Sequence, residues 1–194
     1  MGTVYRHIGD YLSPGAPGVF VEIGSDRGEG STQYLDKLAA GHGTKLYTVD
    51  ISSKAKSWLE NTCQSTEFAV ADGAVWAREF AEKRTDIAVL YLDNFDYIWD
   101  INNITPAIEV QMRQYAGNGV AMTNQTCQVA HMTQLLALYG VLAPQAVIAL
   151  DDTYCYNDCW IGKSGPVVVY LLALGWQIVH QTLDNGVILT RPKK

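Results

Sequence analysis

The chain alternates short apolar runs rich in β-branched residues with longer segments whose apolar residues recur at helical spacing. This alternation is typical of βαβ units that build a mostly parallel sheet. The predicted strands cover residues 18–23, 45–49, 67–70, 87–92, 146–150, 176–181 and 187–190. The predicted helices cover a segment that ends near residue 40, then residues 55–63, 75–83, 128–139 and 166–174.

The last two predicted strands are joined by Asp184, Asn185 and Gly186, which is a hairpin signal. We therefore predict an α/β fold of the Rossmann-like, doubly wound type, with a mostly parallel seven-stranded sheet that ends in an antiparallel hairpin. A length of 194 residues and a hydrophobic content of 48% suit one domain over residues 1–194.

Residues 94–127 break the strand and helix rhythm, because they are polar and aromatic and contain Pro106, Gly117 and Gly119. An insertion of this length beside a strand end is more often functional than idle. We predict a lid or a substrate-binding wall here, with an ordinary connecting loop as the alternative.

Acidic residues follow the predicted strands at the carboxyl ends, where open parallel sheets bind their ligands. They are Asp26, Asp50, Asp72, Asp93, Asp151 and Asp152. Like charges gathered at one edge repel one another unless hydrogen bonds, a cation or a cationic ligand compensates them. Helix capping explains any one of these positions, but it explains the whole set poorly. The pattern therefore predicts a positive ligand at this edge.

The glycine-rich turn at residues 24–30 has the spacing GxxxGxG, which lets a ligand approach the backbone and the N-terminus of the next helix. Short-chain dehydrogenases share this spacing, but they also need a Tyr-x-x-x-Lys pair, which the sequence lacks. The carboxylate of Glu22 suits a ligand ammonium and disfavours a pyrophosphate. Asp50 is placed to accept hydrogen bonds from ribose hydroxyls. Asp72 and Gly73 are candidates to meet an adenine amino group. The alternatives are that Asp50 caps its helix and that Asp72-Gly73 is a simple turn.

Five motifs in order carry a resemblance to a known family: Val-Glu-Ile-Gly-Ser-Asp-Arg-Gly-Glu-Gly-Ser-Thr at 21–32, Val-Asp at 49–50, Ala-Asp-Gly at 71–73, Leu-Asp at 92–93 and Leu-Asp-Asp at 150–152. With them, residues 18–191 resemble class I S-adenosylmethionine-dependent methyltransferases. The sequence is most similar to the small cation-dependent O-methyltransferases, such as the catechol, caffeoyl-CoA and macrocin enzymes.

The resemblance implies a Mg²⁺ site at Asp93, Asp151 and Asp152, where helix capping and cofactor contact are the alternatives. It also implies cofactor contacts by Glu22, Gly24, Ser25, Gly28, Gly30, Ser31, Thr32, Asp50, Ile51, Asp72, Gly73 and Asp93. The sequence departs from the catechol enzymes in a glycine turn that is one residue longer and in the insertion after Asp93. Residues 93–97 lack the prolines common in nucleobase and protein-amide N-methyltransferases, which favours O-methylation.

A general base would remove the acceptor's proton, and the candidates are Asp96, His131 and Lys163. A histidine has a pKa suited to this role. Lys163 lies in a Gly-Lys-Ser-Gly turn, but a Walker loop needs a glycine where Asn157 stands, so ATP binding is excluded. The aromatic residues Tyr97, Trp99, Tyr154, Tyr156 and Trp160 are candidates for a wall around an aromatic or sugar substrate, and ordinary loop anchoring explains them as well.

A net charge of −6 gives no basic surplus for a phosphate backbone, so we expect a small-molecule substrate and no nucleic acid. No apolar run reaches the length of a membrane span, and the four cysteines follow no secretory signal. We therefore expect a cytoplasmic protein with free thiols and no membrane partner; a homodimer is left open. The main hypothesis is Mg²⁺-dependent O-methylation of a small hydroxylated molecule. The alternatives are a metal-independent methyltransferase, a non-catalytic nucleotide-binding module of the same fold, and a short oxidoreductase.

Overall fold

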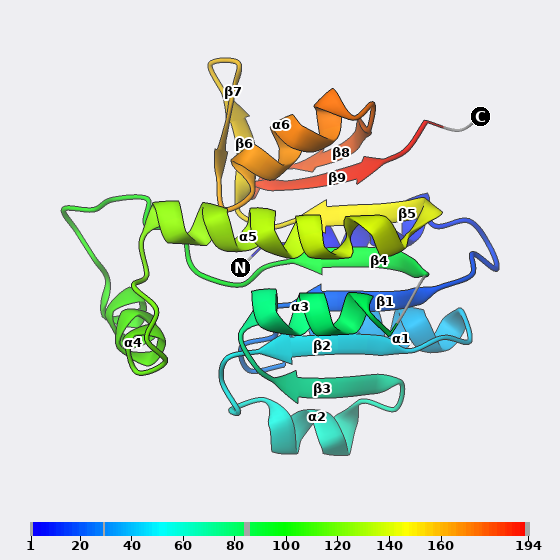
Figure 1. Ribbon diagram of the computed structural model, residues 1–194, viewed down its shortest axis with the longest axis horizontal. Coiled ribbons are helices and arrows are strands. Elements are labelled where there is room, and N and C mark those ends of the chain that lie inside the picture. The colour runs from blue at the N-terminus through cyan, green and yellow to red at the C-terminus, as the bar shows by residue number, and fades with distance from the viewer. Residues whose placement is uncertain (1, 29, 84–85, 193–194) are drawn as a thin grey trace.

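A computed structural model describes residues 2–28, 30–83 and 86–192 of the chain. Seven strands form one sheet in the order β3-β2-β1-β4-β5-β9-β8 (Figure 1). Strands β1 to β5 pair in parallel, and β9 runs antiparallel to both β5 and β8. The predicted doubly wound sheet with its antiparallel end is confirmed.

The strands of this sheet are β1 (Val19–Ile23), β2 (Leu46–Asp50), β3 (Thr66–Val70), β4 (Ile87–Leu92), β5 (Leu142–Leu150), β8 (Gln177–Thr182) and β9 (Gly186–Thr190). The helical elements are η1 (Val4–Tyr11), α1 (Ser31–Gly41), α2 (Lys56–Thr62), α3 (Gly73–Ala81), α4 (Pro106–Ala116), α5 (Asn124–Leu138), η2 (Tyr139–Val141) and α6 (Gly165–Ala173). A separate hairpin joins β6 (Thr153–Tyr156) to β7 (Cys159–Gly162).

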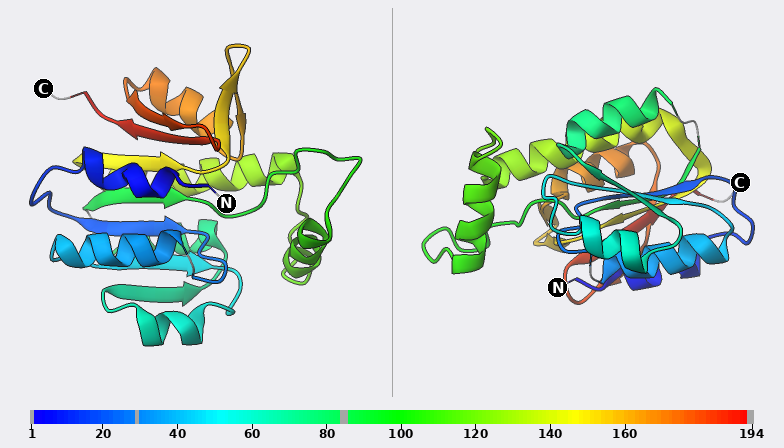
Figure 2. Two further views of the ribbon diagram at one scale, coloured as in Figure 1. Left: turned by 180° about the vertical axis from the view of Figure 1, so that it is seen from behind. Right: turned by 90° about the horizontal axis from the view of Figure 1, so that it is seen from below.

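The sheet is buried on both faces by two apolar clusters. Helices α3, α5 and α6 cover one face, where Val21, Leu90 and Ile148 lie in the core. The short helix η1 and α1 cover the other face, against Phe20 and Val89 (Figure 2). Because both faces are covered, β1 and β4 are buried at every position, which explains why these segments read as continuous apolar runs.

The insertion that we predicted at residues 94–127 contains α4 and the first residues of α5. Thr105 caps α4, and Pro106 occupies its first turn, where the missing N–H costs no helical hydrogen bond. Helix α4 stands beyond the carboxyl ends of the strands, apart from the layers that cover the sheet (Figures 1 and 2). The rings of Phe95 and Tyr115 stack with centroids 4.1 Å apart and join α4 to the loop after β4.

The sequence pattern missed three further features. The segment η1, the helix α4 and the β6–β7 hairpin were all treated as irregular, because each is short and interrupted by polar or aromatic residues. Strand β5 begins at Leu142 rather than at residue 146, because Leu142 still pairs with Ile87. The four cysteines are free, as predicted. In the described parts of the chain, no helix combines the length and the apolar character needed to cross a membrane.

Candidate functional site

A cavity of about 540 Å³ opens at the carboxyl ends of β1, β2, β4 and β5, and residues of α4 line one side of it. Its volume lies within the range of small-molecule sites. The loops after these strands supply Gly24, Ser25, Asp26, Arg27, Asp50, Ile51, Lys54, Asp93, Asn94, Phe95, Asp96, Asp151 and Asp152. Helix α4 adds Gln111 and Tyr115, and the N-terminal segment adds Gly2 and Tyr5.

The predicted site residues divide into two groups. Those that line the cavity are Gly24, Ser25, Ser31, Asp50, Ile51, Asp93, Asp96, Asp151, Asp152 and Lys163. Those that lie elsewhere are Glu22, Gly28, Gly30, Thr32, Asp72, Gly73 and His131. The residues of the second group make hydrogen bonds or close packing contacts within the fold around the cavity.

Glu22 is fully buried inside the sheet, where it does not reach the cavity. Its carboxylate accepts hydrogen bonds from the hydroxyls of Ser31 and Thr32 at 2.7 Å and of Thr48 at 2.8 Å. Burial raises the pKa of Glu22 to about 7, although these three hydroxyls favour the charged form. In the structure Glu22 fastens the start of α1 to the sheet, and its contact with a ligand ammonium stays a prediction.

The glycines of the turn and the Asp72-Gly73 pair have steric and capping roles. A Cβ at Gly28 would lie 2.8 Å from Leu59, and Gly30 precedes α1 with a φ of 70°. Asp72 caps α3 by accepting hydrogen bonds from the N–H groups of Ala74 and Val75. For Asp72 the structure thus supports the capping alternative. Glu29, within the same turn, lies outside the described residues.

Asp50 fixes the two loops that form one wall of the cavity. Its carboxylate accepts hydrogen bonds from the backbone N–H of Asp26 at 2.9 Å and of Ser52 at 2.7 Å. Burial raises the pKa of Asp50, while these N–H groups act in the opposite direction. A carboxylate oxygen has a second lone pair. Asp50 is therefore placed to bind a ligand hydroxyl while it holds both loops.

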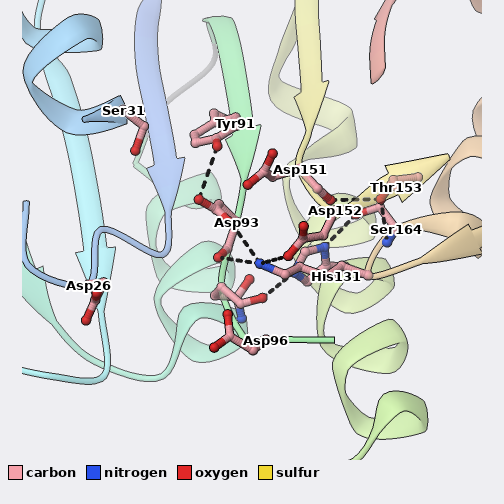
Figure 3. Close-up of polar contacts among 12 residues, drawn as sticks. Asp26, Ser31, Tyr91, Asp93, Asp96, His131, Asp151, Asp152, Thr153 and Ser164 are labelled. Atoms are coloured by element: carbon pink, nitrogen blue, oxygen red, sulfur yellow. Dashed lines mark hydrogen bonds and ion pairs between the residues drawn. The ribbon is translucent and has the colours of Figure 1, made fainter. Parts of the chain in front are cut away.

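Two aspartates, Asp93 and Asp152, form a charged cluster with the buried Lys163 at the ends of β4 and β5 (Figure 3). The ammonium of Lys163 lies 2.8 Å from Oδ1 of Asp93 and 3.0 Å from Oδ2 of Asp152. Tyr91 donates its hydroxyl to the other oxygen of Asp93 at 3.1 Å. Burial alone lowers the pKa of Lys163, but the surrounding aspartates raise it well above its usual range. These carboxylates therefore favour the charged form of Lys163, which donates hydrogen bonds and does not accept a proton.

Asp151 lies beside this cluster and is only 4% exposed. Burial, and then the negative charge of Asp93, raise the pKa of Asp151 far above its usual range. Its Oδ1 atom has no hydrogen-bond partner among the described residues. Gly2 lies against it, and a side chain there would collide with this carboxyl group.

His131 is fully buried and lies behind the cavity wall. Its Nε2 atom contacts the carbonyl oxygen of Asn94 at 2.7 Å, and its Nδ1 atom contacts Oγ of Ser164 at 2.5 Å (Figure 3). Because a carbonyl only accepts, Nε2 carries the proton and Nδ1 accepts from the serine hydroxyl. Burial lowers the pKa of His131 to about 3. His131 is thus a neutral link between α5, the loop after β4 and the start of α6.

Asp96 is the third candidate base, and it lines the cavity, as Lys163 does. Gln111 of α4 donates to its Oδ2 atom at 2.6 Å and accepts from its backbone N–H at 3.2 Å. Burial raises the pKa of Asp96; the ammonium of Lys163 opposes this, and Asp152 and Asp93 add to it. A positioned carboxyl group with a raised pKa is suited to take a proton from a ligand.

The residues predicted to hold Mg²⁺ do not fit that ion in this arrangement. Oxygen atoms of Asp93 and Asp152 are engaged by the ammonium of Lys163, which is a buried cation. Mg²⁺ needs carboxylate oxygens with near-ideal octahedral geometry. In the part of the chain that the structure describes, no cluster of three or more acidic, histidine or cysteine side chains is arranged to hold a metal ion. The predicted magnesium site is thus not supported.

Three buried polar atoms at the cavity have no hydrogen-bond partner among the described residues. They are Oγ of Ser25, Oδ1 of Asn94 and Oδ1 of Asp151. Buried polar groups in proteins are nearly always paired. Their gathering at one cavity indicates that a polar ligand completes their hydrogen bonds.

Comparison with solved structures shows which proteins share this fold. No protein-family model and no curated protein matches the sequence. The chain has the class I methyltransferase fold. It is similar to a 1,6-didemethyltoxoflavin-N1-methyltransferase from Burkholderia thailandensis with bound 1,6-didemethyltoxoflavin and S-adenosylhomocysteine, at 12% identity and a TM-score of 0.53, over 98% of this chain and 79% of that one.

Human methyltransferase-like protein 13 in complex with S-adenosylhomocysteine matches at 15% identity and a TM-score of 0.56, over 100% of this chain and 83% of that one. The MycE methyltransferase of mycinamycin biosynthesis, in complex with Mg and S-adenosylhomocysteine, matches at 14% identity and a TM-score of 0.54, over 96% of this chain and 48% of that one. These likenesses establish the fold, and the resemblance to the cation-dependent subgroup stays a prediction.

Several residues of the site carry no signal in the sequence. Tyr91 lies within the apolar strand β4, and nothing in the sequence indicates that its hydroxyl contacts Asp93. Gln111 and Tyr115 reach the cavity only because α4 folds back over it. The aromatic residues Tyr97, Trp99 and Tyr154 do cluster, with ring centroids 4.5 and 5.5 Å apart, but they lie outside the cavity lining.

Proposed function

We propose that this protein is an S-adenosylmethionine-dependent methyltransferase that transfers the methyl group to a hydroxyl of a small molecule. The observation that carries the proposal is the set of unpartnered buried polar atoms at Ser25, Asn94 and Asp151, at the sheet edge where this fold binds ligands. The shared fold supports it.

The charge of the cavity supports a cationic cofactor. Five aspartates besides Asp151 line it among the described residues, namely Asp26, Asp50, Asp93, Asp96 and Asp152, against the three basic residues Arg27, Lys54 and Lys163. Asp151, whose pKa is raised by burial and by Asp93, is left out of this comparison. S-adenosylmethionine carries a sulfonium, an ammonium and a carboxylate, so it is a net cation. A dinucleotide would bring a pyrophosphate into the same acidic cavity, where like charges repel. The cavity therefore favours the methyl donor over a nicotinamide cofactor.

We assign the parts of the cofactor by the chemistry of the wall. Asp50 would accept hydrogen bonds from the ribose hydroxyls, and Ile51 and Phe95 would pack on the adenine ring. Ser25 would donate to the amino-acid portion, since its hydroxyl is buried and unpartnered. The carboxyl group of Asp151 would lie near the sulfonium side of the cofactor.

Methyl transfer is an in-line displacement in which the acceptor oxygen forms a bond to the methyl carbon as the carbon–sulfur bond breaks. The products are a methyl ether and S-adenosylhomocysteine, and the acceptor's proton must leave. We assign this proton to Asp96, because Lys163 is a permanent cation and His131 is buried and neutral. The acidic cavity also supports our expectation that nucleic acid is not the substrate.

Calorimetric titration tests the cofactor. S-adenosylmethionine and S-adenosylhomocysteine should bind at one site, and NAD should give no binding heat. Asp50→Ala and Ser25→Ala should each weaken binding, by about tenfold for each lost hydrogen bond to a polar ligand. Glu60→Ala, on the exposed face of α2, is the matched control and should bind as the wild type does. Absence of binding of both adenosyl compounds, or NAD binding instead, would refute the proposal.

Turnover separates an enzyme from a binding module of the same fold. Catechols, sugars and hydroxylated peptides should be screened for uptake of labelled methyl from S-adenosylmethionine. Methyl ether formation that requires Asp96 is the expected result. Tight cofactor binding with no transfer to any acceptor class would favour the non-catalytic alternative.

A further inference from the structure

The charged cluster contains a cation of its own. Lys163 lies in the turn between β7 and α6, and its side chain is only 3% exposed. Its ammonium contacts Oδ1 of Asp93, Oδ2 of Asp152 and, at 3.4 Å, the carbonyl oxygen of Asp93. An ammonium has three donors, so these contacts occupy all of them.

The backbone holds Lys163 firmly in this place. Its N–H donates to the carbonyl oxygen of Asp152 at 3.0 Å, and Gln128 donates to the carbonyl oxygen of Gly162 at 3.0 Å. Gly162 has a φ of 95°, and a side chain there would collide with the backbone of Asp152. Glycine is therefore needed for the close approach of the two segments.

The residue after the lysine is fixed as well. Ser164 donates its backbone N–H to Oγ of Thr153 at 3.0 Å and its hydroxyl to His131. The β6–β7 hairpin and α5 together thus place the ammonium between the two carboxylates (Figure 3). The side chain of Lys163 is thus held in the site by the fold, unlike that of a flexible lysine on the surface.

A divalent ion would need the same oxygens. Carboxylates are the ligands that Mg²⁺ takes from proteins, and here Asp93 and Asp152 are the carboxylates of two adjacent strand ends. An ion bound between them would lie against the ammonium of Lys163, whose side chain is only 3% exposed, and like charges at this distance repel.

We infer that the ammonium of Lys163 takes the place of a divalent metal ion in this site, so that methyl transfer here is metal-independent and removal of Lys163 creates a metal site. The statement about methyl transfer rests on the proposed function, whereas the statement about metal binding does not. Lys163 is a positioning residue, because it holds Asp93 and Asp152 and has no donor left for an acceptor.

Metal binding can be measured without cofactor or acceptor, with Mn²⁺ as the probe and its paramagnetic resonance signal as the readout of free ion. Wild-type protein should bind no stoichiometric Mn²⁺ up to about 1 mM, the weak end of protein sites for hard cations. Lys163→Ala should gain one site that is at least about tenfold tighter, because the two half-buried carboxylates of Asp93 and Asp152 lose their compensating charge. Lys54→Ala removes another lysine of the cavity lining and should gain no site.

Loss of a buried cation can prevent folding, so Lys163→Met, which keeps the length of the side chain, accompanies Lys163→Ala, and circular dichroism checks both. If neither variant folds, the wild-type titration still decides. One Mn²⁺ bound by the wild type and lost in Asp152→Asn would overturn the inference. Folded Lys163 variants that bind no more Mn²⁺ than the wild type would overturn it too. Failure of S-adenosylmethionine binding, in contrast, would refute the proposed function and leave the metal result standing.

Discussion

The burial of Glu22 should make the stability of this protein depend on pH in an unusual direction. The pKa of Glu22 is about 7 in the folded protein, against 4.5 for an unperturbed glutamate. The folded state therefore binds this proton more tightly than the unfolded state does. The stability that depends on it is complete below about pH 4.5 and is lost as the pH rises towards about pH 7.

The size of the effect follows from the two pKa values. Raising a pKa from 4.5 to about 7 corresponds to about 3 kcal/mol of unfolding free energy at a pH above 7. No discount for solvent applies, because Glu22 is 0% exposed. The three hydroxyls of Ser31, Thr32 and Thr48 are already included in this balance, since they favour the charged form.

Urea unfolding of the wild type and of Glu22→Gln between about pH 4.5 and pH 8 isolates this carboxyl group, because other groups cancel in the difference. The stability of the wild type relative to the variant should fall by about 3 kcal/mol across this range. Glu60→Gln, which changes an exposed carboxylate on α2, is the control and should follow the wild type at every pH. A Glu22→Gln difference that stays constant with pH would refute the reasoning.

Three further predictions concern the walls of the cavity. His131→Leu should lower the unfolding free energy by about 2 to 4 kcal/mol, because it leaves the carbonyl of Asn94 and the hydroxyl of Ser164 buried without a partner. Nitrogen NMR of the wild type should show a neutral imidazole ring with the proton on Nε2 from about pH 5 to 8. A charged ring in this pH range would contradict the assignment. Gly24→Ala should lower the unfolding free energy by about 2 to 4 kcal/mol, because the φ of Gly24 is 102° and the new methyl group would collide with the backbone of Asn94. An unchanged melting temperature would show that the loop can move away from the methyl group. Asp96→Asn should lower kcat by roughly 10²- to 10⁴-fold. In the wild type the rate should rise with pH as Asp96 loses its proton, and this acid limb of the pH–rate profile should be absent in the variant. A variant that keeps the acid limb would show that another group is the base.

Local patterns were sufficient to predict the seven strands of the large sheet and five of the helices between them, but not η1, α4 or the β6–β7 hairpin. The period of the apolar residues is set by the backbone geometry of each element, so β1, β4 and α6 could be placed from the sequence. The position of the site followed as well, because parallel strands bring their carboxyl ends to one edge, and Asp50, Asp93 and Asp151 do line one cavity. Helix α4 was missed, because its apolar residues contact the loop after β4 and not the sheet.

The roles of the charged residues were decided by the tertiary structure. Glu22 and Lys163 owe their properties to burial and to partners distant in sequence: Thr48 is 26 residues from Glu22, and Asp93 is 70 residues from Lys163. His131 became a neutral structural link for the same reason, since its partners come from the loop after β4 and the start of α6. Burial and neighbouring charge determine whether a side chain is ionised, and both arise only when distant segments pack together.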